Sequence, residues 1–194
     1  MASAAIAAGK EKHTMKHNRL EGSVVAFTRR WHVIQEVDLV RLIGEHRRRA
    51  ALCESVEAVA DALPLLPDPA VAEMLCRELD DMVAGNERDE LPFLEAMLVD
   101  GHDDPLAAAL LDQVRIRCVD DAAKAADVIR ALRAPLRTRR PLHADALGYL
   151  LRGFIEDCRR AIGFEQLTIL AVAGHRLTPD ARALLIDCLT PGPA

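Results

Sequence analysis

The sequence has few aromatic residues and no long hydrophobic run. Only 3% of its 194 residues are aromatic, although 51% are hydrophobic, and most of these are Ala and Leu. Ala and Leu favour helices, whereas strands are enriched in aromatic and β-branched residues. The composition therefore predicts an all-α fold, and the length predicts one domain with a sizeable core.

The N-terminal segment lacks the features of a secretion signal or a membrane span. Its run of small residues is weakly apolar and stops at Lys10, which is too short for either role. We expect residues 1–22 to form a partly disordered tail and residues 23–194 to form the domain. The five cysteines include no Cys-x-x-Cys pair, which predicts reduced thiols in the cytoplasm.

The charge distribution shows no face for nucleic acid. The net charge is −5, and the densest basic runs, HRRR at 46–49 and RTRR at 137–140, are short. We interpret both runs as solvated, since Lys and Arg are mostly exposed. The chain has no phosphate loop, nucleophile elbow or zinc spacing. The sequence therefore favours a non-enzymatic protein that binds neither nucleic acid nor membranes.

Proline marks the starts of three predicted helices. Asp68, Asp104 and Thr178 each precede a proline, which is the usual order of a capping side chain and the first helical residue. Pro92 is expected to bend or interrupt the second helix. The predicted helices cover residues 36–63, 69–98, 105–134, 143–173 and 179–189. Four long helices with short loops predict an antiparallel up-down four-helix bundle, with an N-terminal tail and a short C-terminal fifth helix.

Helix lengths place several polar residues at one level of this bundle. His46 lies 17 residues before the end of the first helix, and Asn86 lies 17 residues after the start of the second. With a rise of about 1.5 Å per residue, both are equally far from the connecting loop. Bundles build metal sites in such central layers. The same level includes Glu90, Cys118 and the stretch 158–165.

At these positions the chain resembles the bacterial hemerythrin-like family, also called HHE cation-binding domains. The resemblance covers residues 37–185 and lies in EHRRRAALCESVEAVADALP (45–64), NERDELPFL (86–94), DPLAAALLDQVRIRCVDD (104–121) and LGYLLRGFIEDCRRAIGFEQLTILAVA (147–173). In that family, single histidines on the first and third helices and an H-x-x-x-E on the second and fourth hold two bridged irons. The resemblance implies a four-helix fold that binds or senses dioxygen, nitric oxide or iron.

This chain keeps only part of the ligand set that the resemblance implies. His46 fits the first histidine, and Glu90 and Glu165 fit the two glutamates. The other three histidine positions hold residues that offer a neutral amide oxygen, a thiol or no donor at all. A slip of one turn on the fourth helix would bring Cys158 to the ligand position but would lose the family spacing to Glu165. The substituted positions are Asn86, Cys118 and Ala161.

The orientation of Glu90 and Glu165 decides which interpretation of this layer holds. In one alternative, both glutamates face solvent. In the other, they face inward and pair with arginine or histidine, because an unpaired buried carboxylate is costly. His46 is the obvious partner in that case. Cys118 and Cys158 are either small core residues or, facing each other, a thiol redox switch.

The preferred interpretation is a degenerate di-iron site without a cofactor, in a protein that acts as a binding or regulatory module. Its partner would be an unidentified protein or small molecule, and a homodimer is left open. The alternative is an iron-binding protein, with one or two irons, or a sensor of oxygen, nitric oxide or redox state. That alternative would use a residual metal site at His46, Glu90 and Glu165, or the Cys118 and Cys158 thiols.

Overall fold

The computed structural model describes residues 33–99, 104–137 and 143–189, and these residues are almost entirely helical. No β-strand occurs in them, so the all-α prediction is confirmed. The predicted tail at residues 1–22 and the basic residues 138–140 lie outside the described part. The elements are α1 (Glu36–Ala62), α2 (Pro69–Gly85), the π-helix η1 (Asn86–Glu90), α3 (Leu91–Leu98), α4 (Pro105–Arg137), α5 (Ala144–Ala173), the 3-10 helix η2 (Gly174–Arg176) and α6 (Pro179–Leu189).

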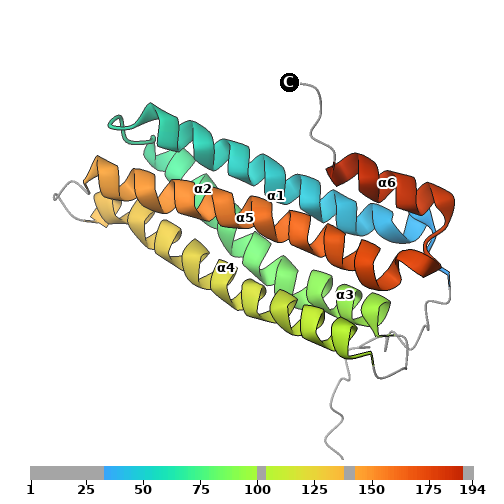
Figure 1. Cartoon of the computed structure of the whole chain (residues 1–194). Helices are drawn as coiled ribbons and strands as arrows, with labels where there is room; N and C mark the ends of the chain where they lie inside the picture. The colour runs from blue at the N-terminus through green and yellow to red at the C-terminus, as the bar shows by residue number, and fades with distance from the viewer. Residues whose placement is uncertain (1–32, 100–103, 138–142, 190–194) are drawn as a thin grey trace, which may run out of the picture.

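The long helices lie side by side, and α2, η1 and α3 together form one of them (Figure 1). α5 packs closely against both α1 and α4, and α4 packs closely against α2. α1 packs much less closely against α2 than against α5. α6 lies alongside the first part of α1 and contacts α1 and α5 (Figure 1). None of the described helices combines the length and hydropathy that a membrane span requires.

The predicted capping residues begin their helices as expected. The Asp68 side chain accepts a hydrogen bond from the Ala70 N–H at 2.8 Å, which caps α2. The Asp104 side chain does the same for the Leu106 N–H at the start of α4, at 2.9 Å. These bonds satisfy amide groups that have no partner within the first helical turn. The observed starts of α2, α4 and α6 coincide with the predicted prolines.

Pro92 interrupts the second long helix, but the distortion lies just before it. Residues Asn86–Glu90 form a π-helical turn, which the Leu91 N–H closes by donating to the Asn86 carbonyl. Proline has no N–H to donate, and its ring clashes with the carbonyl four residues earlier in an α-helix. A wider π turn relieves that clash. Asn86 and Glu90, which lie four residues apart, share one side of this turn, and both are buried.

The core consists of two apolar clusters, which together contain side chains from all the α-helices. One cluster takes apolar residues from the second half of α1, from α2, from the second half of α4 and from the first half of α5. The other uses the first half of α1, α3, the first half of α4, the end of α5 and α6. Among the described residues, buried polar side chains lie between these clusters on α1, η1, α4 and α5, and they are His46, Arg49, Asn86, Glu90, Asp121, Glu165, Gln166 and Thr168.

A buried charge cluster as the candidate functional site

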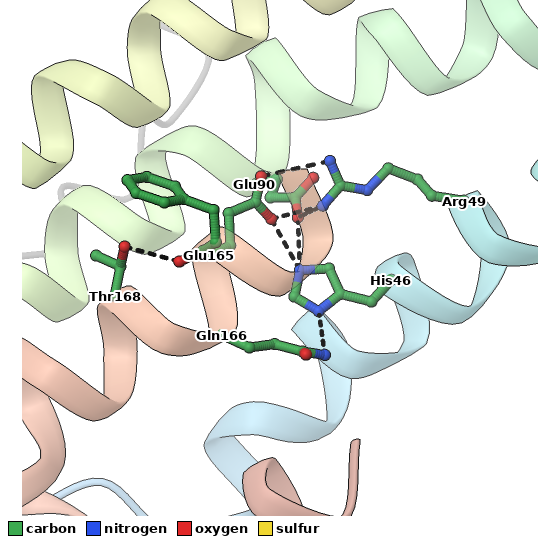
Figure 2. A network of polar contacts seen from close by, with 7 residues as sticks. His46, Arg49, Glu90, Glu165, Gln166 and Thr168 are labelled. Atoms are coloured by element: carbon green, nitrogen blue, oxygen red, sulfur yellow. Dashed lines mark hydrogen bonds and ion pairs between the residues drawn. The ribbon is translucent and has the colours of Figure 1, made fainter. Parts of the chain in front are cut away.

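Four ionisable side chains meet between the two apolar clusters (Figure 2). His46 and Arg49 come from α1, Glu90 from η1 and Glu165 from α5, and each is at most 6% exposed. His46 and Arg49 lie three residues apart, so one face of α1 presents both. The structure thus brings together His46, Glu90 and Glu165, which the resemblance predicts as ligands, and it adds Arg49.

Arg49 bridges the two glutamates. Its Nη2 donates to Glu90 Oε1 at 2.9 Å and to Glu165 Oε2 at 2.5 Å, while its Nη1 lies 3.4 Å from Glu165 Oε1. The interpretation of the 46–49 run as solvated is therefore wrong for Arg49, although Arg47 and Arg48 are exposed. The signal was present in the sequence, since position 49 follows the buried His46 by one helical turn.

His46 completes the ion pairs from the other side. Its Nε2 lies 2.9 Å from Glu165 Oε2 and 3.3 Å from Glu90 Oε1. Its Nδ1 lies 3.3 Å from the Gln166 amide nitrogen. This amide orientation matches a neutral imidazole that accepts at Nδ1, and exchanging the amide O and N matches the imidazolium. The glutamates therefore face inward and pair with His46 and Arg49 rather than with solvent.

The surroundings shift the pKa values of Glu90 and Glu165 in opposite directions. Burial raises the pKa of Glu165, but the Arg49 charge and the His46 hydrogen bond outweigh it and lower that pKa overall. Burial dominates for Glu90, whose pKa is raised despite His46 and Arg49. Burial lowers the pKa of His46, but hydrogen bonds to Glu165 and Glu90 outweigh it, and the net shift is upward. These surroundings therefore favour the ionised form of Glu165 and the protonated form of Glu90.

Asn86 supports Glu90 from the same π turn. Its amide faces two acceptors, so its nitrogen is assigned to that side, where it donates to Glu90 Oε2 at 2.9 Å and to the Met82 carbonyl at 3.2 Å. Asn86 is 5% exposed. Asn86 and Glu90, which occupy the H-x-x-x-E spacing of the second predicted helix, thus form a hydrogen bond within one turn, in which the amide N–H donates to the carboxylate.

The predicted cysteine pair is divided between the two apolar clusters. Cys158 belongs to the apolar cluster that includes α2. Cys118 is half-buried and packs on the other apolar cluster, which includes α3. The thiol that interacts with Cys158 is that of Cys53 on α1, and this interaction together with burial raises the pKa of Cys158. Burial raises the pKa of Cys118 to about 12. All five thiols are free, and the Cys118 and Cys158 switch stays a prediction.

The donor set does not fit the two-iron centre that the resemblance implies. One ligand atom each from His46, Glu90 and Glu165 lies within 4.8 Å of the others, which is close enough for a single ion. The same atoms hold the Arg49 guanidinium, whose positive charge repels a cation at this distance. Asn86 directs its amide nitrogen at Glu90, and the buried Ala161 offers no donor. A metal ion would have to displace Arg49 first.

Comparison with protein-family models, with curated proteins and with solved structures found no match to this chain. The resemblance to hemerythrin-like proteins therefore stays a prediction that rests on the quoted motifs. The function has to be argued from the geometry of the charge cluster and its surroundings.

Proposed function

We propose that this protein is a hemerythrin-like, antiparallel four-helix bundle that uses ion pairs where its family uses iron. In this proposal it acts as a non-enzymatic binding or regulatory module. The observation that carries the proposal is the Arg49 side chain, which lies between Glu90 and Glu165 and bonds to both (Figure 2). The element order and the short connections between the long helices support the up-down topology.

Arginine and a proton supply the charge that metal ions would otherwise supply. Two buried carboxylates without a cation nearby would be strongly unfavourable. Arg49 contributes one positive charge, and a proton on His46 or on Glu90 cancels the second negative charge. The cluster is therefore neutral overall and closed by its own contacts. It needs no ion to hold the helices together.

The same pairing argues against catalysis at this site. Glu165 accepts from both Arg49 and His46, and Glu90 contacts Arg49, His46 and Asn86. Neither carboxylate is free to take a proton from a substrate, as a general base must.

The five free thiols fit a reducing compartment, so we propose that the protein is cytoplasmic.

Anaerobic loading with ferrous iron tests the proposal. We expect no stoichiometric iron and no visible absorption band in the unmodified chain after removal of excess metal. Arg49→Ala removes the competing cation, and we expect iron retention to increase in that variant. The exposed Arg48→Ala is the matched control and should behave like the unmodified chain. Stoichiometric iron in the unmodified chain would overturn the proposal, and circular dichroism establishes that each variant is folded.

One observation favours a second candidate, a mononuclear iron sensor. His46, Glu90 and Glu165 place three ligand atoms within 4.8 Å of one another. An ion of this kind would bind only after Arg49 leaves the carboxylates. The same iron titration separates the candidates, because the sensor requires retention of about one iron per chain.

A further inference from the structure

A cavity opens between α1 and α2, beside the charge cluster. Its volume is about 460 Å³, which lies within the usual range for small-molecule sites. The two helices pack loosely against each other compared with α1 and α5. Leu52 and Met82 contribute apolar side chains to the cavity wall. The side-chain position of Gly85 is also empty, because a Cβ built there meets no atom within 4 Å.

The inner wall of this cavity contains a donor without an acceptor. Arg49 lines the cavity and is 4% exposed. Its two terminal nitrogens bond to the glutamates, but its Nε–H has no partner among the described residues. A buried donor without an acceptor is destabilising. The Nε atom is closed to solvent, so a carbonyl oxygen of a bound molecule satisfies it once the side chains that cover it move aside.

The outer part of the cavity is acidic. Glu78 and Asp81 on α2 are exposed and line the cavity, and neither forms an ion pair within the described residues. Arg48, which also lines it, pairs with Glu45. The two carboxylates therefore leave an uncompensated negative charge at the opening, which attracts a cationic group.

We propose that the cavity between α1 and α2 binds a small organic amine that carries a carbonyl or amide oxygen. The oxygen accepts from Arg49 Nε, the apolar middle packs on Leu52 and Met82, and the ammonium group lies near Glu78 and Asp81. This inference deepens the proposed function, on which it rests, by naming the ligand class of the binding module. The ligand contacts the same arginine that closes the charge cluster.

Titration with ω-aminoalkanamides of increasing chain length, followed by amide chemical shifts, tests this site. We expect saturable shifts within the segments 45–55 and 78–86, which contain the residues that line the cavity. Alkanamides of the same length without the amine should bind more weakly. Failure of the whole series to saturate, or equal binding by the amine-free compounds, would overturn the inference.

Two variants locate the site. Gly85→Leu fills the empty position, and we expect at least a tenfold loss of affinity, whereas Gly153→Leu on α5 also meets no neighbour within 4 Å and should bind normally. Glu78→Gln/Asp81→Asn should weaken binding about fivefold, and Glu54→Gln/Asp120→Asn should not. Unchanged binding in both cavity variants would place the amine elsewhere and overturn the inference.

Parallel iron analysis keeps the two proposals distinguishable. The titrations are run with a metal chelator, and iron retention is measured on the same preparation. Stoichiometric iron overturns the proposed function whatever the amine does. Absence of both iron and amine binding overturns only the ligand assignment.

Discussion

Arg49 decides what the centre of this protein can do. A single guanidinium bonds to Glu90 and Glu165 at once, and both carboxylates are nearly inaccessible to solvent. Removing one partner of a buried ion pair leaves an uncompensated charge, which costs far more than the pair itself contributes. The identity of residue 49 therefore decides whether the cluster is neutral without metal.

Replacement of Arg49 should be the most damaging change in the cluster. We expect Arg49→Ala to lower the free energy of unfolding by about 3 to 5 kcal/mol, because both glutamates lose their permanent cation. Arg48→Ala, at an exposed position, should change it by less than about 0.5 kcal/mol. Urea unfolding measures both. Equal effects of the two substitutions would show that the buried pairs do not hold the helices together.

His46 should make stability depend on pH in the neutral range. Its folded pKa is raised above 6.5 by Glu165 and Glu90, against the effect of burial and Arg49. The stabilisation is therefore fully present below pH 6.5 and is lost as pH rises through the folded pKa.

His46→Gln should remove this loss, so the difference in unfolding free energy between the two chains should shrink toward alkaline pH. Chemical unfolding at several pH values measures it, with the exposed His175→Gln as the matched control. A difference that grows with pH would contradict the assignment.

At the scale of the elements, the second long helix positions half of the site. Pro92 and the π turn before it place Asn86 and Glu90 inward together, while the buried face of α3 continues with Phe93, Leu94 and Met97. π turns occur frequently at functional sites. The preceding turns of the same helix, with Met82 and Asn86, line the cavity, so one irregular helix serves both features.

Gly85 weakens α2 at its C-terminal end. It has helical dihedral angles, and a Cβ there meets no atom within 4 Å. Gly85→Ala should therefore stabilise the protein by about 0.5 to 1 kcal/mol, as expected for an unstrained helical glycine.

Gly148→Ala is the comparison, because its Cβ would lie 3.3 Å from Leu63 and 3.2 Å from Arg152. We expect a smaller gain or a loss there. Thermal unfolding of both variants measures the effects, and a loss of stability in Gly85→Ala would contradict the open space beside α2.

At the scale of the whole molecule, two apolar clusters enclose one polar layer. Each cluster contains residues from α1, α4 and α5, and one of the two clusters also contains residues from α3 and α6. Burial of these side chains supplies most of the driving force for folding. The polar layer adds orientation, because its bonds form only when α1, η1 and α5 have one relative register.

Metal removal should leave the global stability unchanged. A protein whose fold depends on a bound ion loses stability when a chelator removes that ion. Because Arg49 and His46 neutralise the glutamates here, we expect equal melting temperatures with and without a strong chelator. Differential scanning calorimetry provides the measurement. A lower melting temperature in chelator would point to a structural metal instead.

The sequence alone was sufficient for the helices. Three of their starts follow from Asp68, Asp104 and Thr178 before proline, because capping and proline chemistry act within a single turn. The level of His46, Glu90 and Glu165 was also predictable, since the rise per residue of a helix is constant and the loops are short.

Only the tertiary structure decided which charges meet. The spacing from His46 indicates that Arg49 faces inward, but local patterns do not reveal that its side chain crosses to both Glu90 and Glu165. The weak packing of α1 on α2, which opens the cavity, is also invisible in the sequence. Such features depend on the relative rotation and spacing of helices, and these follow from all the core contacts together.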